Sequence, residues 1–145
     1  MMAIRLWLLG VALAISGCAA GPDFKKVDEI PQGKALIYIY RPPTMWGAAL
    51  TPSVVIDKLN AIQLTVGGYY PYLSDPGEVT IALIHTGRMA TKLPVKTGQT
   101  YYVKATLQVM GAPYIEALSA DAAQPELSEC KRLPPVEGVR TTPMP

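Results

Sequence analysis

Apolar residues recur at every second position over most of residues 35–118. The run ALIYIYR at 35–41 is apolar on both faces, which is typical of a central strand. Further runs of this kind lie at 52–57, 61–66, 69–73, 79–83, 89–95, 100–107 and 114–118. Because turn residues separate the runs at short intervals, the pattern predicts an all-β fold, a single antiparallel β-sandwich of about seven to eight short strands.

Prolines and a change of period refine this prediction. Pro71 and Pro94 cannot donate to a strand ladder, so we expect their segments at edges or strand ends. Beyond residue 118 helix-forming residues prevail, and Pro125 suits a first helical position. We therefore expect a short C-terminal helix at 125–131, with Leu127 and Cys130 on one face. The Pro-rich residues 132–145 are expected to form a disordered tail.

A different pattern opens the chain. Arg5 precedes an apolar run at 6–15, which is shorter than the roughly 20 residues that span a bilayer. A charged start, a short apolar core and small residues after it are typical of a secretory signal peptide. The alternative is a buried N-terminal helix. The run ends on Ile15-Ser16-Gly17-Cys18, and these four residues resemble the lipobox of bacterial lipoproteins.

This resemblance implies cleavage between Gly17 and Cys18 and a diacylglycerol on the Cys18 sulfur. Two or three acyl chains anchor a protein stably, because each buried methylene adds about 0.8 kcal/mol. Ala19, rather than Asp, follows the cysteine, which resembles the outer-membrane sorting signal.

The expected domain organisation follows from this anchor. Residues 1–17 would be removed, and residues 18–33 would form a lipidated tether with a reach of roughly 20 Å if flexible. The β-sandwich would occupy residues 34–131, anchored to membrane lipid and facing the periplasm from the outer membrane.

Charge and motif content narrow the function classes. Without residues 1–17 the chain carries 12 Lys and Arg against 11 Asp and Glu, with no basic stripe typical of nucleic-acid binding. His85, the single histidine, lies in a turn and is expected to be exposed rather than a general base. Asp57 and Asp75 also lie in turns, where Asp bonds its own backbone. No nucleophile or metal-ligand motif is present, so we expect no enzymatic activity, no cofactor and no metal site.

Lipidation of Cys18 would leave Cys130 as an odd thiol in an oxidising compartment. We favour a buried cysteine that packs as a small hydrophobe. The alternatives are an intermolecular disulfide or a reactive site, but no His or second Cys lies near it in sequence to activate it.

Four segments, GKALIYIYRP, SVVIDKLNAIQL, GGYYPYLSDPGEVTIAL and VKTGQTYYVKATL, together resemble a family of small bacterial lipoproteins with a domain of unknown function. The stretch from VVIDKLN to SDPGEVTI is also similar to the PEGA-type envelope β-sandwich, in which a Val-x-Val-Asp hairpin precedes a Pro-Gly turn. Lys58 and Leu59 depart from that pattern by replacing its usual Asp-Gly pair, and Glu78 follows Gly77. The resemblance spans about residues 33–131 and implies a sandwich, but no activity.

Aromatic residues give the positive functional signal. We predict a partner surface at Met45, Trp46, Tyr69, Tyr70 and Tyr72, because Tyr and Trp are favoured at recognition surfaces. For the tyrosines, covering a sheet face is the favoured alternative. We expect a non-enzymatic module that binds or scaffolds another envelope component, an unidentified protein or glycan. The alternative function is a glycan or peptidoglycan binding module that uses exposed Tyr and Trp rings.

Overall fold

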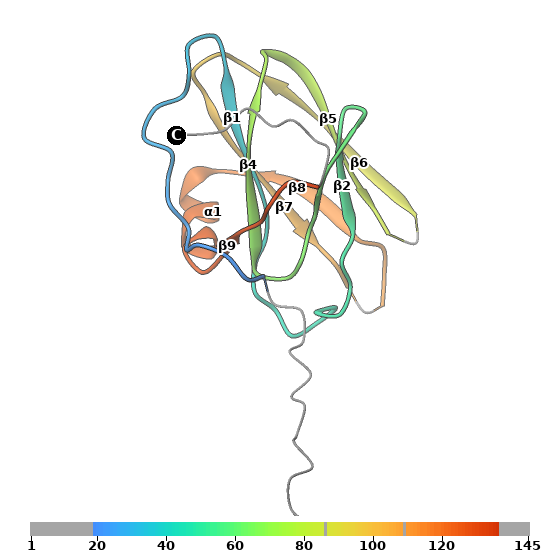
Figure 1. Cartoon of the computed structure of the whole chain (residues 1–145). Coiled ribbons are helices and arrows are strands. Elements are labelled where there is room, and N and C mark those ends of the chain that lie inside the picture. The colour runs from blue at the N-terminus through green and yellow to red at the C-terminus, as the bar shows by residue number, and fades with distance from the viewer. Residues whose placement is uncertain (1–18, 86, 109, 137–145) are drawn as a thin grey trace, which may run out of the picture.

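The computed structural model describes residues 19–85, 87–108 and 110–136, which form two packed β-sheets and one short helix (Figure 1). The strands are β1 (Ala35–Arg41), β2 (Ser53–Ile56), β3 (Leu59–Gln63), β4 (Gly68–Ser74), β5 (Gly77–Ile84), β6 (Arg88–Val95), β7 (Thr100–Thr106), β8 (Tyr114–Leu118) and β9 (Lys131–Arg132), and the helix is α1 (Ala120–Leu127). The predicted β-sandwich with a short C-terminal helix is confirmed.

The strand order is β8-β7-β1-β4-β9 in one sheet and β3-β2-β5-β6 in the other. The expectation of wholly antiparallel pairing is wrong at two places, because β1 runs parallel to β7 and β4 runs parallel to β9. Parallel neighbours require a crossover connection. Here the chain leaves the first sheet after β4, forms β5 and β6 in the second, and returns as β7 in the direction of β1.

β1 is buried on both faces, as its sequence predicts, and its residues alternate between two apolar clusters. Ala35, Ile37 and Ile39 belong to the core between the sheets. Leu36, Tyr38 and Tyr40 belong to a second cluster on the outer face of the five-stranded sheet. Ile81 and Leu83 of β5 and Val103 of β7 join the core between the sheets, which confirms the period-two pattern of those strands.

The prolines lie where a missing N–H is tolerated. Pro94 is on β6, an edge strand. Pro71 is on β4, whose second neighbour β9 pairs only with Gly68 and Tyr69. At Pro71 the strand is therefore effectively an edge, as expected from the sequence.

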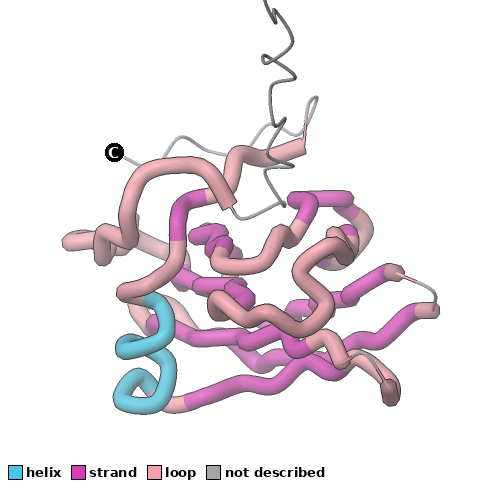
Figure 2. The backbone as a smooth tube through the Cα atoms, turned by 90° about the horizontal axis from the view of Figure 1, so that it is seen from below, coloured by secondary structure: helices cyan, strands magenta, loops and turns pink. Residues whose placement is uncertain are grey.

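The outer face of the five-stranded sheet is covered by α1, with Ala123 and Leu127 fully buried against it. Figure 2 shows the helix beside the strands when the molecule is seen from below. The predicted bounds 125–131 are wrong, because the helix begins after Ser119, whose carbonyl accepts the Ala123 N–H at 3.0 Å. Pro125 is inside the helix rather than at its first position, so the helix lacks the hydrogen bond that an N–H at this position would donate to the Asp121 carbonyl.

Residues 19–33 lie against the same outer face and are not a free tether. The Phe24 ring packs edge-on against Tyr38 and Tyr69, with ring centroids 5.5 and 5.1 Å apart. The Val27 N–H donates to the Tyr38 hydroxyl at 2.8 Å, and the Arg132 N–H donates to the Pro22 carbonyl at 2.8 Å. The flexible reach predicted for this segment is therefore not observed in residues 19–33.

The first residues of the predicted tail also belong to the fold. Leu133 is buried, and the Val136 N–H donates to the Ala61 carbonyl at 2.9 Å. Residues 137–145 lie outside the described residues, as do the predicted signal peptide and its cleavage site at Gly17 and Cys18. Within residues 19–136 as described, no helix has the length and apolar character needed to cross a membrane.

Candidate functional site at the end of the sandwich

Arg41 organises the end of the sandwich where β1 finishes. The alternation of β1 directs its side chain toward the space between the sheets, and the residue is only 1% exposed. Its two terminal nitrogens donate to the carbonyls of Gly47 and Leu50, each at 2.6 Å. These hydrogen bonds hold the loop of residues 42–52 against the end of the core. Burial lowers the pKa of Arg41.

The buried charge of Arg41 is solvated by loop carbonyls rather than by an acid. Among the described residues no ion pair involves Arg41, and its Nε has no hydrogen-bond partner. A buried guanidinium depends on such hydrogen bonds, because losing them leaves a desolvated charge. This role of Arg41 could not be predicted from the sequence, since a charged residue that ends a strand is usually exposed.

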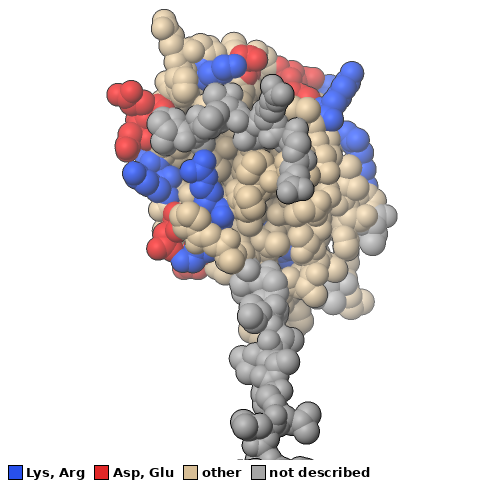
Figure 3. All heavy atoms as spheres, in the orientation of Figure 1, with Lys and Arg blue, Asp and Glu red and all other residues tan. Residues whose placement is uncertain are grey.

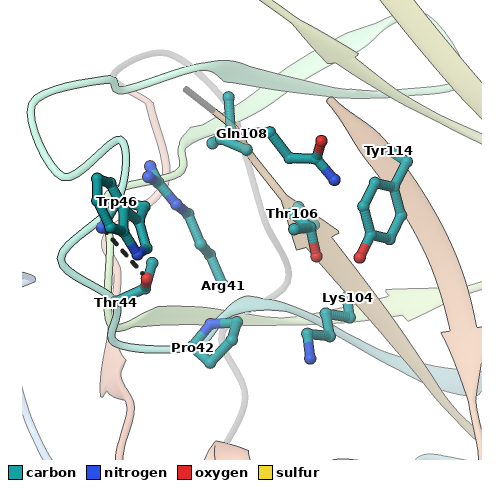
Figure 4. A pocket seen from close by; sticks show the side chains of 10 residues that line it. Arg41, Pro42, Thr44, Trp46, Lys104, Thr106, Gln108 and Tyr114 are labelled. Atoms are coloured by element: carbon teal, nitrogen blue, oxygen red, sulfur yellow. Dashed lines mark hydrogen bonds between the residues drawn. The ribbon is translucent and has the colours of Figure 1, made fainter. Parts of the chain in front are cut away.

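A cleft of about 380 Å³ opens beside Arg41 (Figure 4). Trp46 and Tyr114 stand on opposite sides of it, and they are 71% and 38% exposed. The other residues that line the cleft are Arg41, Pro42, Thr44, Lys104, Ala105, Thr106, Leu107 and Gln108. Two exposed rings with mainly apolar and uncharged polar neighbours suit binding through contact area.

A second cleft, of about 550 Å³, lies on the other side of the same loop. It is lined by Ala19, Pro43, Thr44, Met45, Val66, Gly67, Glu129 and Lys131. Met45 is 92% exposed at its edge. The two predicted partner residues of the loop, Met45 and Trp46, therefore stand exposed between two clefts.

The tyrosines of the predicted partner surface do not join them. Tyr69 and Tyr70 are buried on opposite faces of β4, because α1 and the N-terminal segment cover the outer face and the second sheet covers the inner face. Tyr72 is half-buried and packs against the core between the sheets. The favoured alternative, that these rings cover sheet faces, describes all three. Tyr114, which the sequence did not single out, takes their place beside Trp46.

Glu126 ties α1 to the outer face of the sheet. Its carboxylate accepts hydrogen bonds from the Tyr40 hydroxyl at 2.7 Å and from the Lys104 ammonium at 2.5 Å. Burial raises the pKa of Glu126, but these two hydrogen bonds outweigh it and hold the pKa below its ordinary value. Burial raises the pKa of Tyr40, and the hydrogen bond from its hydroxyl to Glu126 raises it further. This network positions Lys104 at the first cleft.

Cys130 is a free, buried thiol in the outer-face cluster. Its Sγ lies 3.4 Å from the Glu126 carbonyl oxygen, and burial raises the pKa of the thiol to about 12. The favoured sequence interpretation, a small buried hydrophobe, fits this environment, because a reactive cysteine needs exposure and a lowered pKa.

We expect Cys130 to resist thiol reagents in the folded protein and to react only as the protein unfolds. Because the folded thiol has a raised pKa, its contribution to stability is complete below about pH 9 and is lost as the pH rises toward about 12. Urea unfolding measured across this pH range should show the free energy of unfolding declining. The decline should be smaller in the Cys130→Ala variant. Native modification as fast as that of a free thiol would contradict this expectation.

The predicted turn residues have structural roles. His85 is exposed after β5, and its N–H donates to the Gly87 carbonyl at 3.0 Å. Asp57 adopts a left-handed conformation with φ of 54°, and its carboxylate accepts the Thr80 N–H at 2.9 Å. Asp75 pairs with Lys34 at 2.6 Å. Across the described part of the chain, no group of three or more His, Cys, Asp and Glu side chains is arranged to hold a metal ion.

The fold and the clefts define a small two-sheet β-sandwich domain with an exposed apolar end. A family model described as Protein of unknown function (DUF2846) matches residues 31–117, and the chain belongs to this family. The match takes in β1 to β7 and most of β8, whereas the segments that cover the outer face lie outside it. No curated protein matches the chain. No solved structure matches it either.

Proposed function

We propose that this protein is a cell-envelope lipoprotein whose β-sandwich is a non-enzymatic binding or scaffolding module at the outer membrane, facing the periplasm. The observation that carries the proposal is the sequence Ile15-Ser16-Gly17-Cys18, placed directly after a short apolar run. Ala19 then ties the chain to the domain, because its N–H donates to the Val66 carbonyl at 3.0 Å. The resemblance to bacterial lipoproteins and to PEGA-type envelope sandwiches agrees with this proposal.

The lining of the first cleft favours binding over catalysis. Its two cationic side chains are already engaged, Arg41 with loop carbonyls and Lys104 with Glu126. A general acid or base must be free to exchange a proton with a substrate. The exposed groups that remain, Trp46 and Tyr114, offer contact area and polar ring atoms for a partner.

A glycan or peptidoglycan ligand is the second candidate, and the pair of rings across the first cleft favours it. Muropeptides added to the protein should quench Trp46 emission in a saturable way if they bind there. Trp46→Phe with unchanged affinity by calorimetry would place any binding elsewhere. No binding, with protein partners recovered by crosslinking, would favour scaffolding.

The lipid anchor has a direct test. Cys18→Ala is expected to abolish incorporation of labelled fatty acid and to release the protein from the membrane fraction, because no other thiol is accessible for the acyl chains. Cys130→Ala is the matched control and should keep both properties. If the Cys18→Ala protein still incorporates the labelled fatty acid, the anchor is not at Cys18.

A further inference from the structure

We propose that the end of the sandwich bearing Met45, Trp46 and Met110 rests on the lipid surface itself. We name these three residues the apolar end. The inference rests on the proposed lipid anchor at Cys18 and adds an orientation to it. The domain would stand with this end in the membrane interface and its opposite end turned toward the periplasm.

The apolar end is unusual in its exposure. Met45, Met110 and Trp46 are 92%, 89% and 71% exposed, and the next large apolar side chain of the described residues, Leu59, is 51% exposed. Residues 42–52 contain no charged side chain, and neither do residues 105–108 and 110–115, which include the ends of β7 and β8 and the described part of the loop between them. Exposed apolar groups that lie together mark an interaction surface rather than chance exposure.

The topology brings these loops and the start of the described chain to one end. Because β1 and β7 are parallel and Tyr40 pairs with Lys104, the loops that follow both strands leave the sheet side by side. β4 is antiparallel to β1 and begins opposite Arg41, so Val66 and its partner Ala19 lie at that end as well. Figure 1 shows both loops and the blue start of the described chain at the lower end.

The lining of the clefts confirms these neighbours. Ala19 and Met45 line one cleft, and Trp46, Gln108 and Tyr114 line the other. Cys18 is one residue from Ala19, about 3.8 Å between Cα atoms. An acylated Cys18 would therefore hold this end of the domain close to the bilayer.

Lipid fits this surface better than a protein partner does, for two reasons. Trp is enriched at membrane interfaces, and uncharged loops lose little hydration there. The anchor also presents lipid at a high effective concentration, which makes even weak contacts count. The opposite end differs in charge, because the ion pairs Lys34–Asp75 and Glu78–Lys92 lie at the other ends of β1 and β5. In Figure 3 charged groups gather mainly on the upper and left parts of the face shown.

Trp46 provides the measurement. The chain has two tryptophans, Trp7 and Trp46, so Trp7→Phe leaves Trp46 as the single indole however the leader is processed. The full chain is expressed in cells, purified in detergent and reconstituted into vesicles of phosphatidylethanolamine and phosphatidylglycerol with brominated acyl chains. Insertion of Trp46 into the membrane interface should shift its emission to the blue. In the brominated vesicles this emission should also lose most of its intensity relative to unbrominated vesicles.

A matched control moves the indole to the opposite end. Thr97 is exposed in the turn before β7, and Trp7→Phe with Trp46→Phe and Thr97→Trp should give emission that bromine does not change. Met45→Ser with Met110→Ser should keep the acyl label and vesicle flotation but lower the quenching of Trp46.

The outcomes separate the two proposals. An acylated, vesicle-bound protein whose Trp46 emission is unaffected by bromine overturns the lipid contact and leaves the anchor standing; quenching of Trp46 by an added envelope protein would then assign the end to that partner. Equal quenching at positions 46 and 97 also overturns the orientation. A chain that carries no acyl group and does not float overturns the anchor, and the lipid contact with it.

Discussion

Arg41→Met is expected to lower the free energy of unfolding by about 2–5 kcal/mol, since the carbonyls of Gly47 and Leu50 would lose donors at the end of the core. Met keeps the length and apolar stem of the side chain, so the loss reports mainly on the two hydrogen bonds. We also expect the loop of residues 42–52 to open. Chymotrypsin should then cut after Trp46 faster than in the parent protein, and urea unfolding should show the loss of stability.

Arg88→Met is the matched control, because Arg88 is exposed at the start of β6 and has no ion pair among the described residues. It should leave both measurements unchanged. Arg41→Lys should recover only part of the stability, since one ammonium lacks the planar fork that reaches two carbonyls. An Arg41→Met protein with parental stability and parental cleavage at Trp46 would refute the proposed role of Arg41.

Phe24→Ala is expected to lower the free energy of unfolding by about 2–4 kcal/mol. The Phe24 ring is half-buried and packs edge-on against Tyr38 and Tyr69, so its loss opens the cluster under residues 19–33. The Lys25 and Val27 N–H groups, which donate to the hydroxyls of Tyr69 and Tyr38, would lose their alignment. Urea unfolding gives the stability, and hydrogen exchange of the Val27 amide reports on the segment.

Lys26→Ala is the control for this prediction, since Lys26 is exposed in the same segment. It should change the stability by a few tenths of a kcal/mol at most. Equal effects of the Phe24 and Lys26 substitutions would mean that residues 19–33 contribute no packing and act as the tether that the sequence predicts.

The strands could be predicted because their apolar period is undisturbed. β1 has the bounds expected for ALIYIYR, since both of its faces are apolar and Gly33 and Pro42 delimit it. The packing of the N-terminal segment is not evident from its pattern, because Phe24, Val27 and Ile30 follow no strand or helix period, yet all three pack on the outer face. Their spacing of three is the signal that could have indicated a packed face.

Of the residues at the candidate site, only the two in the loop could be predicted from the sequence. Met45 and Trp46 stand out as large apolar residues in a segment without strand period, and the structure leaves them exposed. Tyr69 and Tyr70 could not be placed from the sequence, because their burial depends on α1 and on the second sheet. Arg41 and Tyr114 meet at the first cleft through the parallel pairing of β1 and β7, which no local pattern reveals.

The pairing of β1 with β7 also limits how early a newly made chain can complete its fold. β1 can pair with β4 once half of the domain exists, but Leu36 pairs with Thr100 and Asp23 bridges Lys131, so the five-stranded sheet is complete only when nearly all of the domain has been synthesised. Long-range pairing of this kind delays folding. Under the export proposed above, a nascent chain that cannot complete its five-stranded sheet early would stay extended while it is translocated. If the protein is exported as proposed, the topology that builds the core would also keep the chain unfolded until translocation is complete.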